Sequence, residues 1–500
     1  MKFLGIRLDE HDSNVTYTNG DVVKYYKPER STQVKHFGYN SISSWIESEN
    51  ILDFEIDEID AIALVLDVFR HPWCKKEDPE ALYEEIKIPH APFEDLDCPI
   101  YRVDHHYAHS LSCWPLKDNS ATDFVLDGFG DLYRSCSVFS KNKMMDVYTL
   151  ETMFSFGKFL SNFGEHIGVL GIGDDAAGKL MALKEFGNQN KKFYNYISQY
   201  ELKDSAKIFD WQAFEKIVGS KLAAQYQYLD FLRTVHDYME VAYPKFFLKH
   251  AHPTNVITYS GGIAQNVCIN SKLIKHFPKL IIPPHCNDEG LSLGCVEFLR
   301  QLNNQPKFKK DNYPFWQTDI APKKNPSEKT IKETAQDLAD GKIVGWYQGH
   351  GEIGPRALGN RSILMSPEVK NGKSILNDKV KHREDYRPFA ASIKLDKTKD
   401  YFDWEGESPF MLYSVKFKDK IFNPISHIDG TSRIQTVTSD QWYYNELINE
   451  FEKITGLPML LNTSLNDNGK PIAGKPEDAL KLFENSQIDS IVIGDKTYNK

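Results

Sequence analysis

Short apolar runs alternate with longer segments of helical periodicity through the first part of the chain. The runs FLGI, AIALVLD, DFVLDGFGD and NVITYSGG predict buried strands. The segments AQNVCINSKLIKHF and Gln225 to Phe247 instead repeat their apolar positions with the spacing of an α-helix. This alternation predicts an α/β domain, in which functional residues are expected where strands end and glycines begin.

The pattern breaks in a polar stretch from Gln301 to Glu328, which is rich in proline, lysine and asparagine. Such a stretch is typical of a crossing between domains, and we divide the chain into domains of residues 1–304 and 305–500. At the end of this stretch, Ser327 is predicted to cap a helix that runs to about Leu338. KIVGWYQG is predicted to be a strand that enters a glycine-rich loop. The second domain is therefore also expected to mix strands and helices.

Composition narrows the class of protein. The 500 residues include 41% hydrophobic ones and carry a formal net charge of -10, which favours globular domains and argues against a general nucleic-acid binder. No uncharged apolar run reaches the ~18 residues that a membrane helix needs, and the N-terminus lacks the pattern of a signal peptide. The seven cysteines contain no CxxC pair and fit reduced thiols. We expect a cytoplasmic protein that binds neither nucleic acid nor membrane.

A histidine pair offers the first candidate for chemistry. His105 and His109 lie four residues apart, so on a helix both rings project from one face, as two metal ligands require; His106 would point elsewhere. Asp127 ends a predicted strand and Asp288 precedes a predicted helix, and both offer carboxylate oxygens. Two imidazoles with two carboxylates suit Fe(II), Mn(II) or Zn(II). A pair of surface histidines without a metal is the alternative.

Glycine-rich turns offer a second candidate site. Gly261 and Gly262 follow a predicted strand and precede a helix expected to begin near Ala264. Glycines let the backbone approach a ligand, and a helix N-terminus favours an anion. Asn266 and Asn270 lie one turn apart on that helix. Tight packing of the helix on the strand explains the two glycines equally well.

Two further segments carry small polar residues or a lysine beside glycine. HDSN, from His11 to Asn14, is expected to form the turn between the first strand and a second strand, DVVKYY, and could cradle a phosphate. Lys35 follows in ERSTQVKH. In DDAAGKLM, Lys179 follows a glycine at the point where a helix is expected to begin, and it could bind a phosphate. An ordinary polar turn and solvated charges are the alternatives.

The second domain places many cations in loops that also hold glycine, proline and hydroxyl residues. In an acidic chain such loops favour an anion site, because arginine suits the bidentate recognition of phosphate and carboxylate. Solvation at the surface is the alternative for each cation taken singly. The residues are Arg356, Arg361, Lys381, Arg383, Arg387 and Arg433, with Asn462, Thr463 and Ser464 nearby in LNTSLN.

These motifs together resemble the NodU/CmcH family of O-carbamoyltransferases. HDS, ERxxxVKH, HHxxH, LDGxGD, GGxAxN, NDxG, GPRALGNRSIL, VKxRExxRPFA, HxDGTxRxQTV and LNTSxN occur in that family's order and span essentially the whole chain. The three long motifs GPRALGNRSIL, VKHREDYRPFA and HIDGTSRIQTV make the resemblance highly specific.

The resemblance implies an N-terminal domain of the actin-like ATPase type (ASKHA, Kae-like) and a C-terminal YrdC-like α/β domain. The second would make carbamoyladenylate from carbamoyl phosphate and ATP, with Mg²⁺ accompanying the ATP. The first would transfer the carbamoyl group to a hydroxyl of a small-molecule acceptor, a natural product or a sugar, at Fe(II) or another divalent metal. The resemblance leaves a homodimer open.

The same resemblance assigns roles to single residues. His105, His109, Asp127 and Asp288 match metal ligands, and His11 and Lys35 match residues near the transferred group and the acceptor. Those expected at the nucleotide or the activation site are Gly128, Lys179, Gly261, Gly262, Asn266, Arg356, Lys381, Arg387, Asn462 and Ser464, with Arg433 as a catalytic residue.

Three positions depart from the family pattern. Ala177 stands where EGK is frequent, and Pro28 and Gln33 replace a glutamate and an arginine. These positions match residues near the acceptor in the family, so the changes indicate an acceptor that differs from those of other members. Two other functions compete: carbamoylation of a partner protein, as in HypF, whose CxxC zinc fingers are missing here, and a nucleotide-binding regulator related to sugar kinases. A tRNA-modifying threonylcarbamoyl enzyme would need a basic surface.

Overall fold

The computed structural model describes the chain except residues 10, 40–43, 68–70, 72–73, 170–173 and 203–210. Its contacts divide the chain into two compact units. The first consists of Met1–Tyr25 and Gly38–Lys310, and the second of Tyr26–Phe37 and Asp311–Lys500. This division differs from the predicted boundary after residue 304 in two places, at residues 305–310 and at the early segment 26–37.

The early segment packs with the second unit for an identifiable reason. The guanidinium of Arg30 is buried and donates to the carbonyl oxygens of Gly354 at 3.1 Å and Glu352 at 3.5 Å. The backbone of Gly474 also approaches it closely, since a Cβ at that glycine would lie 2.4 Å from the Arg30 oxygen. These contacts join positions far apart in sequence, so no local pattern predicts them.

The first sheet of the first unit has the strand order β3-β2-β1-β4-β6-β5. β1 pairs antiparallel with β2 and parallel with β4, and every residue of β1 and β4 is buried. Burial on both faces explains why these strands have continuous apolar runs rather than an alternation. The strands are β1 (Phe3–Leu8), β2 (Asn14–Thr18), β3 (Val23–Tyr26), β4 (Ala61–Leu66), β5 (Tyr83–Ile86) and β6 (Ile100–Val103).

The second sheet repeats the plan of the first. Three successive antiparallel strands, β7, β8 and β9, are followed by β10, which lies parallel beside β7. This duplicated arrangement is that of actin-like ATPases, so the fold class predicted for the first domain is confirmed. The strands are β7 (Thr122–Leu126), β8 (Arg134–Ser140), β9 (Lys143–Thr149), β10 (Ile257–Ser260) and β11 (Leu280–Ile281).

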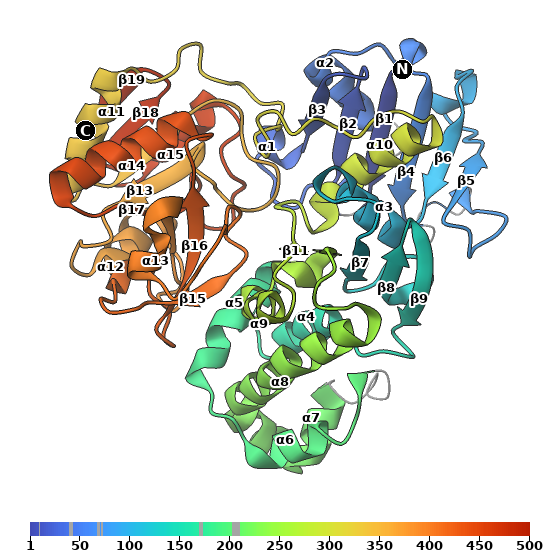
Figure 1. The fold of residues 1–500 in the computed structure, drawn as a ribbon, viewed down its shortest axis with the longest axis horizontal. Coiled ribbons are helices and arrows are strands. Elements are labelled where there is room, and N and C mark those ends of the chain that lie inside the picture. The colour runs from blue at the N-terminus through green and yellow to red at the C-terminus, as the bar shows by residue number, and fades with distance from the viewer. Residues whose placement is uncertain (10, 40–43, 68–70, 72–73, 170–173, 203–210) are drawn as a thin grey trace. The chain divides into compact units, whose positions relative to one another are not determined.

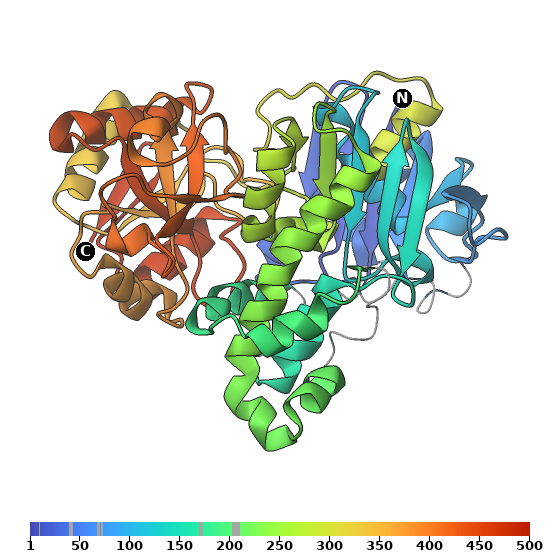
Figure 2. The ribbon, with the colours of Figure 1, turned by 60° about the horizontal axis from the view of Figure 1, so that its bottom comes forward.

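Two helices of the first unit pack against each other and lead to the site. α3 (His105–Ser112) follows β6, and α10 (Leu291–Leu302) packs on α3, β1 and β4. The chain between β9 and β10 forms a group of helices, and Figures 1 and 2 show that α8 is the longest helix of this group. The helices of this group are α4 (Phe156–His166), α5 (Asp174–Leu183), α6 (Lys191–Ile197), α7 (Trp211–Val218) and α8 (Lys221–His250). α9 (Val267–His276) follows β10, and a short α2 (Ser48–Leu52) comes earlier in the chain.

The second unit contains an eight-stranded sheet in the order β15-β16-β14-β17-β13-β12-β18-β19. Ser327 caps α11 (Glu328–Ala339), as predicted, and α11 packs against α14 (Trp442–Thr455). The strands are β12 (Val344–Tyr347), β13 (Arg361–Met365), β14 (Ala390–Lys394), β15 (Ser414–Lys416), β16 (Thr431–Val437), β17 (Met459–Ser464), β18 (Ser490–Ile493) and β19 (Lys496–Asn499). The other helices are α1 (Glu29–Thr32), α12 (Gly372–Leu376), α13 (Thr398–Tyr401) and α15 (Pro476–Asn485).

Three local predictions are wrong in detail. The strand after the HDSN turn is Asn14–Thr18 rather than DVVKYY, which contributes the third strand instead. The helix expected near Ala264 begins at Val267, because a 3₁₀ turn over Gly262–Gln265 comes first. Lys179 lies within α5, which begins at Asp174, and not at a helix start.

Two composition-based expectations can be compared with the described residues. None of the described helices is long and apolar enough to cross a membrane. None of the seven cysteines, which all lie within the described residues, forms a disulfide.

Candidate metal centre and cation cluster

The start of α3 positions the histidine pair. Asp104 caps the helix by accepting from the Tyr107 amide at 3.1 Å, and its other oxygen lies 2.6 Å from the Arg134 guanidinium. The four-residue spacing then puts His105 and His109 on one face. The ring of His106 turns elsewhere, with Nδ1 2.8 Å from the Ser137 hydroxyl. The sequence predicts this arrangement.

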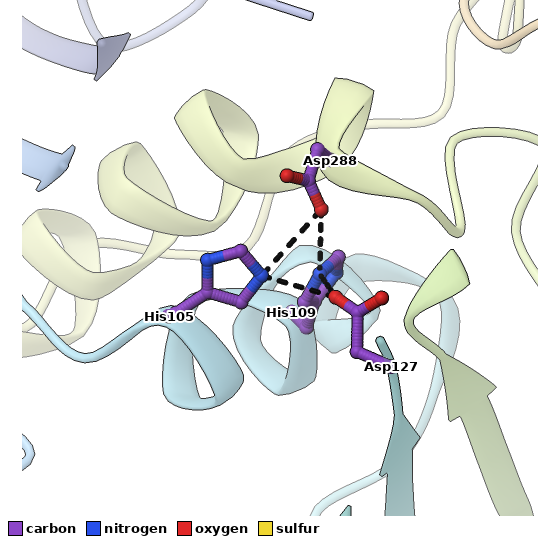
Figure 3. Close-up of side chains that lie close together, drawn as sticks. All are labelled: His105, His109, Asp127 and Asp288. Carbon is purple, nitrogen blue, oxygen red and sulfur yellow. Dashed lines mark hydrogen bonds and ion pairs between the residues drawn. The ribbon is translucent and has the colours of Figure 1, made fainter. Parts of the chain in front are cut away.

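The structure brings all four predicted metal ligands together. Figure 3 shows both rings on α3 facing Asp127, at the end of β7, and Asp288, just before α10. His105 Nε2 lies 3.1 Å from Asp127 Oδ2 and 3.5 Å from Asp288 Oδ1. The corresponding distances from His109 Nε2 are 3.3 and 3.4 Å. All four ligand atoms lie within 4.8 Å of one another.

Each carboxylate points one oxygen at the histidines and anchors the other. Asp127 Oδ1 accepts from the amides of Gly128 at 2.7 Å and Gly262 at 3.2 Å. Asp288 Oδ2 lies 2.9 Å from the guanidinium of Arg7. Secondary contacts of this kind orient metal ligands in proteins. Sequence reasoning missed Arg7, although a charged residue inside the apolar run FLGIRL is a signal for it.

The electrostatics of the group reflect two buried negative charges beside two rings. Burial disfavours a charged imidazole, but Asp288 and Asp127 outweigh it and raise the pKa of His105 to about 10. Burial alone would raise the pKa of Asp288, but His105 and Arg7 hold it well below its usual range. A buried carboxylate pair needs compensating positive charge. Here a proton on His105 can supply it, and so could a metal ion.

The donor set fits a divalent cation. Two imidazole nitrogens and two carboxylate oxygens are a ligand combination used by Fe(II), Mn(II) and Zn(II). His109 is fully buried, yet among the described residues its ring nitrogens form no hydrogen bond of good geometry. A ring nitrogen in this condition is expected where it ligates a metal.

A second group of potential ligands, His236, Glu240 and Cys268, fits a metal less well. The ammonium of Lys184 lies 3.0 Å from Glu240 Oε1, and the Nδ1 atom of His236 lies 3.1 Å from the same oxygen. Burial opposes the charge of Lys184, but Cys268, Glu240 and Glu185 raise its pKa further above its usual value. The lysine therefore already supplies a cation to this group.

The glycine-rich loop beside the metal ligands is shaped by packing. Gly261 has φ +91°, and a Cβ there would lie 2.2 Å from the Leu126 oxygen, so only glycine fits. Asn266 caps α9 by accepting from the Ile269 amide at 3.1 Å, and its Nδ2 lies 3.0 Å from the Nε2 atom of His236. The packing explanation therefore applies to Gly261, and Asn266 has structural partners of its own.

His11 lies close enough to the metal ligands to interact with their charge. Its Nδ1 is 3.1 Å from Asp12 Oδ2, and its side chain is 43% exposed. The hydrogen bond to Asp12 raises the pKa of His11 despite burial, and Asp288 adds to the effect. A donor role for Nδ1 toward Asp12 leaves Nε2 as the atom that can accept a proton. The structure thus leaves the predicted proton-transfer role open to this residue.

In the second unit, Lys381 is bound by a loop after β17. Its ammonium lies 2.9 Å from the Ser464 oxygen and 2.6 Å from both the backbone and the side-chain oxygen of Asn466. Burial and the charges of Arg383 and Arg387 hold the pKa of Lys381 well below its usual value. Lys381 and Ser464 are therefore neighbours, as the prediction of a shared site requires.

Several guanidinium groups act together on Arg433. Burial, followed by Arg356, Arg383 and Arg387, lowers the pKa of Arg433. Its buried Nε has no hydrogen-bond partner among the described residues. Burial and Arg387 lower the pKa of Arg383 to about 9. A guanidinium keeps its proton in proteins. The lowered pKa values of Arg433 and Arg383 therefore mean that several cations lie close together.

Two other predicted residues have different surroundings. Asn462 is buried in β17, where its amide lies 3.0 Å from the Ser392 hydroxyl and 3.3 Å from the Ala357 oxygen. Arg361 is also buried, 2.7 Å from Asp319, and stacks on the ring of Tyr347 at 3.6 Å. Both side chains therefore support the fold around the cation cluster.

Lys35 belongs to the second unit, in the segment Tyr26–Phe37. Its charge lowers the pKa of Lys381, although less than Arg383 and Arg387 do. The structure thus associates Lys35 with the cation cluster, defined as Lys35, Arg356, Lys381, Arg383, Arg387 and Arg433. A place of Lys35 beside the acceptor, which the resemblance implies, stays a prediction.

Comparison with known proteins gives matches to both parts of the chain. A family profile described as "Carbamoyltransferase N-terminus" matches residues 92–296, and one described as "Carbamoyltransferase C-terminus" matches residues 335–500. Together the two profiles match most of the chain.

Curated relatives include nodulation protein NolNO of Sinorhizobium fredii, 28% identical over 432 residues, which cover 78% of this chain and 63% of the relative. Nodulation protein NolO of Bradyrhizobium diazoefficiens is also 28% identical, with 78% of each protein covered. The 3'-hydroxymethylcephem-O-carbamoyltransferase of Amycolatopsis lactamdurans is 33% identical over 253 residues, or 48% of each protein. The chain thus spans less than two thirds of NolNO and about half of the cephem enzyme.

Solved structures are more distant. Full-length HypF in a phosphate- and nucleotide-bound form covers 62% of this chain at 14% identity, with a TM-score of 0.37. The activator of 2-hydroxyisocaproyl-CoA dehydratase from Clostridium difficile with bound ADPNP covers 62% at 12% identity, also with a TM-score of 0.37.

Proposed function

Because this chain belongs to the carbamoyltransferase family by its match to both family profiles, we propose that it is an ATP-dependent O-carbamoyltransferase. The second unit would activate carbamoyl phosphate with ATP, which Mg²⁺ accompanies, and the first unit would transfer the carbamoyl group to a small-molecule hydroxyl. A natural product or a sugar is the proposed acceptor class, and the cytoplasm is the proposed compartment.

The proposed activation proceeds through two displacements. Water cleaves carbamoyl phosphate to carbamate and phosphate. A carbamate oxygen then attacks the α-phosphorus of ATP, forming a carbamoyladenylate and releasing pyrophosphate. In the first unit the acceptor hydroxyl attacks the carbamoyl carbon, AMP leaves with the bonding electrons, and the hydroxyl proton goes to a base.

The cation cluster of the second unit is the observation that carries this proposal. Carbamoyl phosphate and ATP are both anions, and bringing them together requires positive charge held in place before they arrive. The crowding of Arg356, Arg383 and Arg387 around Arg433 raises the energy of the empty cluster. A bound polyanion would relieve that repulsion, so the cluster is built for more than one negative group.

In the first unit, His105, His109, Asp127 and Asp288 would hold the divalent metal. Fe(II) or another divalent ion there would supply Lewis acidity to a carbamoyl carbonyl or an acceptor hydroxyl. Arg7, Gly128 and Gly262 fix the outer oxygens of the two carboxylates. His11 would accept the hydroxyl proton at Nε2, while Asp12 holds Nδ1.

An exchange assay tests the activation step without knowledge of the acceptor. Purified protein with ATP, carbamoyl phosphate and labelled pyrophosphate is expected to move label into ATP, because carbamoyladenylate formation is reversible. The Lys381→Met variant is expected to lose this exchange, and the His109→Ala variant to retain it while losing transfer. Lys420→Met, which changes an exposed lysine, is the matched control. Absence of carbamoyl-phosphate-dependent exchange in the wild type would refute the proposal.

The competing functions give different results in the same assay. A nucleotide-binding regulator would show neither exchange nor transfer. A HypF-like enzyme would show exchange, but its labelled carbamoyl group would appear on a partner protein and not on a small alcohol. Loss of exchange in His109→Ala equal to that in Lys381→Met would contradict the assignment of the two steps to separate units.

A further inference from the structure

Three large apolar side chains are exposed in the turn that follows the metal ligand Asp127. Phe129, Leu132 and Tyr133 have exposed fractions of 44%, 41% and 50%. The strand before them is buried throughout. Exposed apolar groups that cluster beside a candidate reaction centre mark a binding surface more often than scattered ones do.

The turn is held in one conformation. The Gly128 oxygen accepts from the Ser155 hydroxyl at 2.9 Å, the Gly130 amide donates to the Arg134 oxygen at 2.8 Å, and the Tyr133 oxygen accepts from the Leu150 amide at 2.9 Å. A Cβ at Gly130 would lie 2.8 Å from the His106 ring. The aromatic side chains therefore project from a hydrogen-bonded turn, and such preorganisation reduces the entropy lost on ligand binding.

The two aromatic residues lie together and near the reaction centre. Their ring centroids are 6.0 Å apart, with the planes tilted by 40°. Phe129 is two residues from Asp127, so their Cα atoms are at most about 7 Å apart even in an extended chain. Phe129 and the metal ligand Asp127 therefore belong to the same short turn after β7.

A positive charge lies beside this surface. The ammonium of Lys158 is 5.3 Å from the centroid of the Phe129 ring. It covers part of the ring and disfavours a second cation there, because like charges at this distance repel. An acceptor that binds here should be neutral or anionic.

We propose that Phe129 and Tyr133 form a platform that selects the acceptor, a neutral or anionic alcohol whose hydroxyl is carried on a ring with a flat apolar face. This inference rests on the proposed carbamoyl transfer. The apolar face of the ring packs on Phe129 and Tyr133, and Lys158 rejects amino-substituted rings. Both residues act by positioning the acceptor, so their loss should raise its KM and leave kcat nearly unchanged.

The test compares three alcohols that differ in ring and charge. Labelled carbamoyl phosphate and ATP are supplied with methyl glucoside, with the linear polyol sorbitol, or with methyl glucosaminide, which is cationic at neutral pH. The wild type is expected to carbamoylate methyl glucoside with a kcat/KM about tenfold above that of either other alcohol, since an aromatic contact changes affinity by about three- to tenfold.

The variants separate the roles of the residues. Phe129→Ala and Tyr133→Ala are each expected to raise the KM for methyl glucoside about three- to tenfold, towards that of sorbitol, and Lys158→Glu to favour the glucosaminide over the glucoside. Tyr226→Ala, which removes an exposed aromatic residue from α8, is the matched control. Thermal unfolding of each variant tests whether the change reached the fold, and since both aromatic side chains are exposed we expect melting temperatures close to the wild type.

Three outcomes would overturn the platform. They are equal use of the ring and the linear alcohol by the wild type, an unchanged acceptor KM in Phe129→Ala and Tyr133→Ala, or transfer to none of the three alcohols. The same variants are run by size exclusion, because loss of a dimer together with an unchanged KM would assign the surface to a second copy of the chain. Pyrophosphate exchange is measured in parallel: its absence refutes the proposed function itself, whereas its presence with any of these outcomes refutes only the platform.

Discussion

Loading the four metal ligands with a divalent cation is expected to expel one proton from His105. In the metal-free protein the two carboxylates raise the pKa of His105 to about 10, so its ring is protonated at neutral pH. A metal ion needs the unprotonated nitrogen. Binding at pH 7 should therefore release close to one proton from this residue for each metal ion bound.

The size of the effect on metal affinity follows from the difference between that pKa and the pH. With a pKa of about 10, the proton weakens the apparent metal affinity about a thousandfold at pH 7, a factor of ten for each pH unit. The affinity should rise with pH and level off near pH 10. The stability of the metal-free fold depends on pH in the opposite direction. A raised histidine pKa stabilises it fully below its unfolded value near 6.5, and this stabilisation is lost as the pH rises to about 10.

Calorimetric titration with Mn(II) in buffers of different protonation enthalpy measures the released protons directly. The slope of the observed heat against the buffer enthalpy is expected to be near one in the wild type at pH 7. It should fall towards zero in His105→Gln, which still offers a polar side chain but carries no proton to lose. His252→Gln, a change at an exposed histidine, is the control.

Proton release near zero in the wild type at pH 7 would refute the reasoning. It would mean that His105 is neutral before the metal arrives and that the carboxylates are compensated in some other way. An affinity that does not change between pH 6 and pH 8 would lead to the same conclusion.

Three other substitutions have expected outcomes. Gly261→Ala should destabilise the fold by about 3 kcal/mol or more, because its Cβ would lie 2.2 Å from a backbone oxygen and φ is +91°. Gly178→Ala, which has open space at its Cβ, should change the melting temperature little. Equal melting temperatures for the two variants would contradict this reasoning. Arg7→Met should lower metal affinity by about ten- to a hundredfold, measured as metal content after dialysis, and full retention would show that the arginine does not orient the carboxylate. Arg433→Ala should raise the KM for ATP about tenfold or more without changing metal content, and an unchanged KM would place ATP elsewhere.

The metal-ligand cluster could be predicted from sequence because each of its parts has a local signal. His105 and His109 are separated by one helical turn, and Asp127 ends an apolar run just before a glycine. The strand and helix that present them are the ones predicted, β7 and α3. The sequence pattern does not predict the contacts that hold these ligands in place. One of them is the ion pair of Arg7 with Asp288, which joins opposite ends of the first unit's sequence.

The roles of polar residues in loops were harder to predict. Asn266 caps α9, a role that its position immediately before a helix also fits, and its contact with a nucleotide stays a prediction. The sequence of Lys35 and its neighbours contains no signal that this segment packs in the second unit, and a place of Lys35 beside the acceptor stays a prediction. Both residues lie at points where the pairing of distant segments decides the surroundings, and a single sequence contains no signal for that pairing.

The placement of Tyr26–Phe37 in the second unit has a consequence for the order of folding. Arg30 is synthesised among the first strands, but the carbonyl oxygens of Glu352 and Gly354 that it binds are synthesised much later. Contacts between such distant positions carry a large loop-closure entropy and slow folding. During translation the segment therefore lacks its partners until residues 352–354 have been made, and only then can it take its place in the second unit.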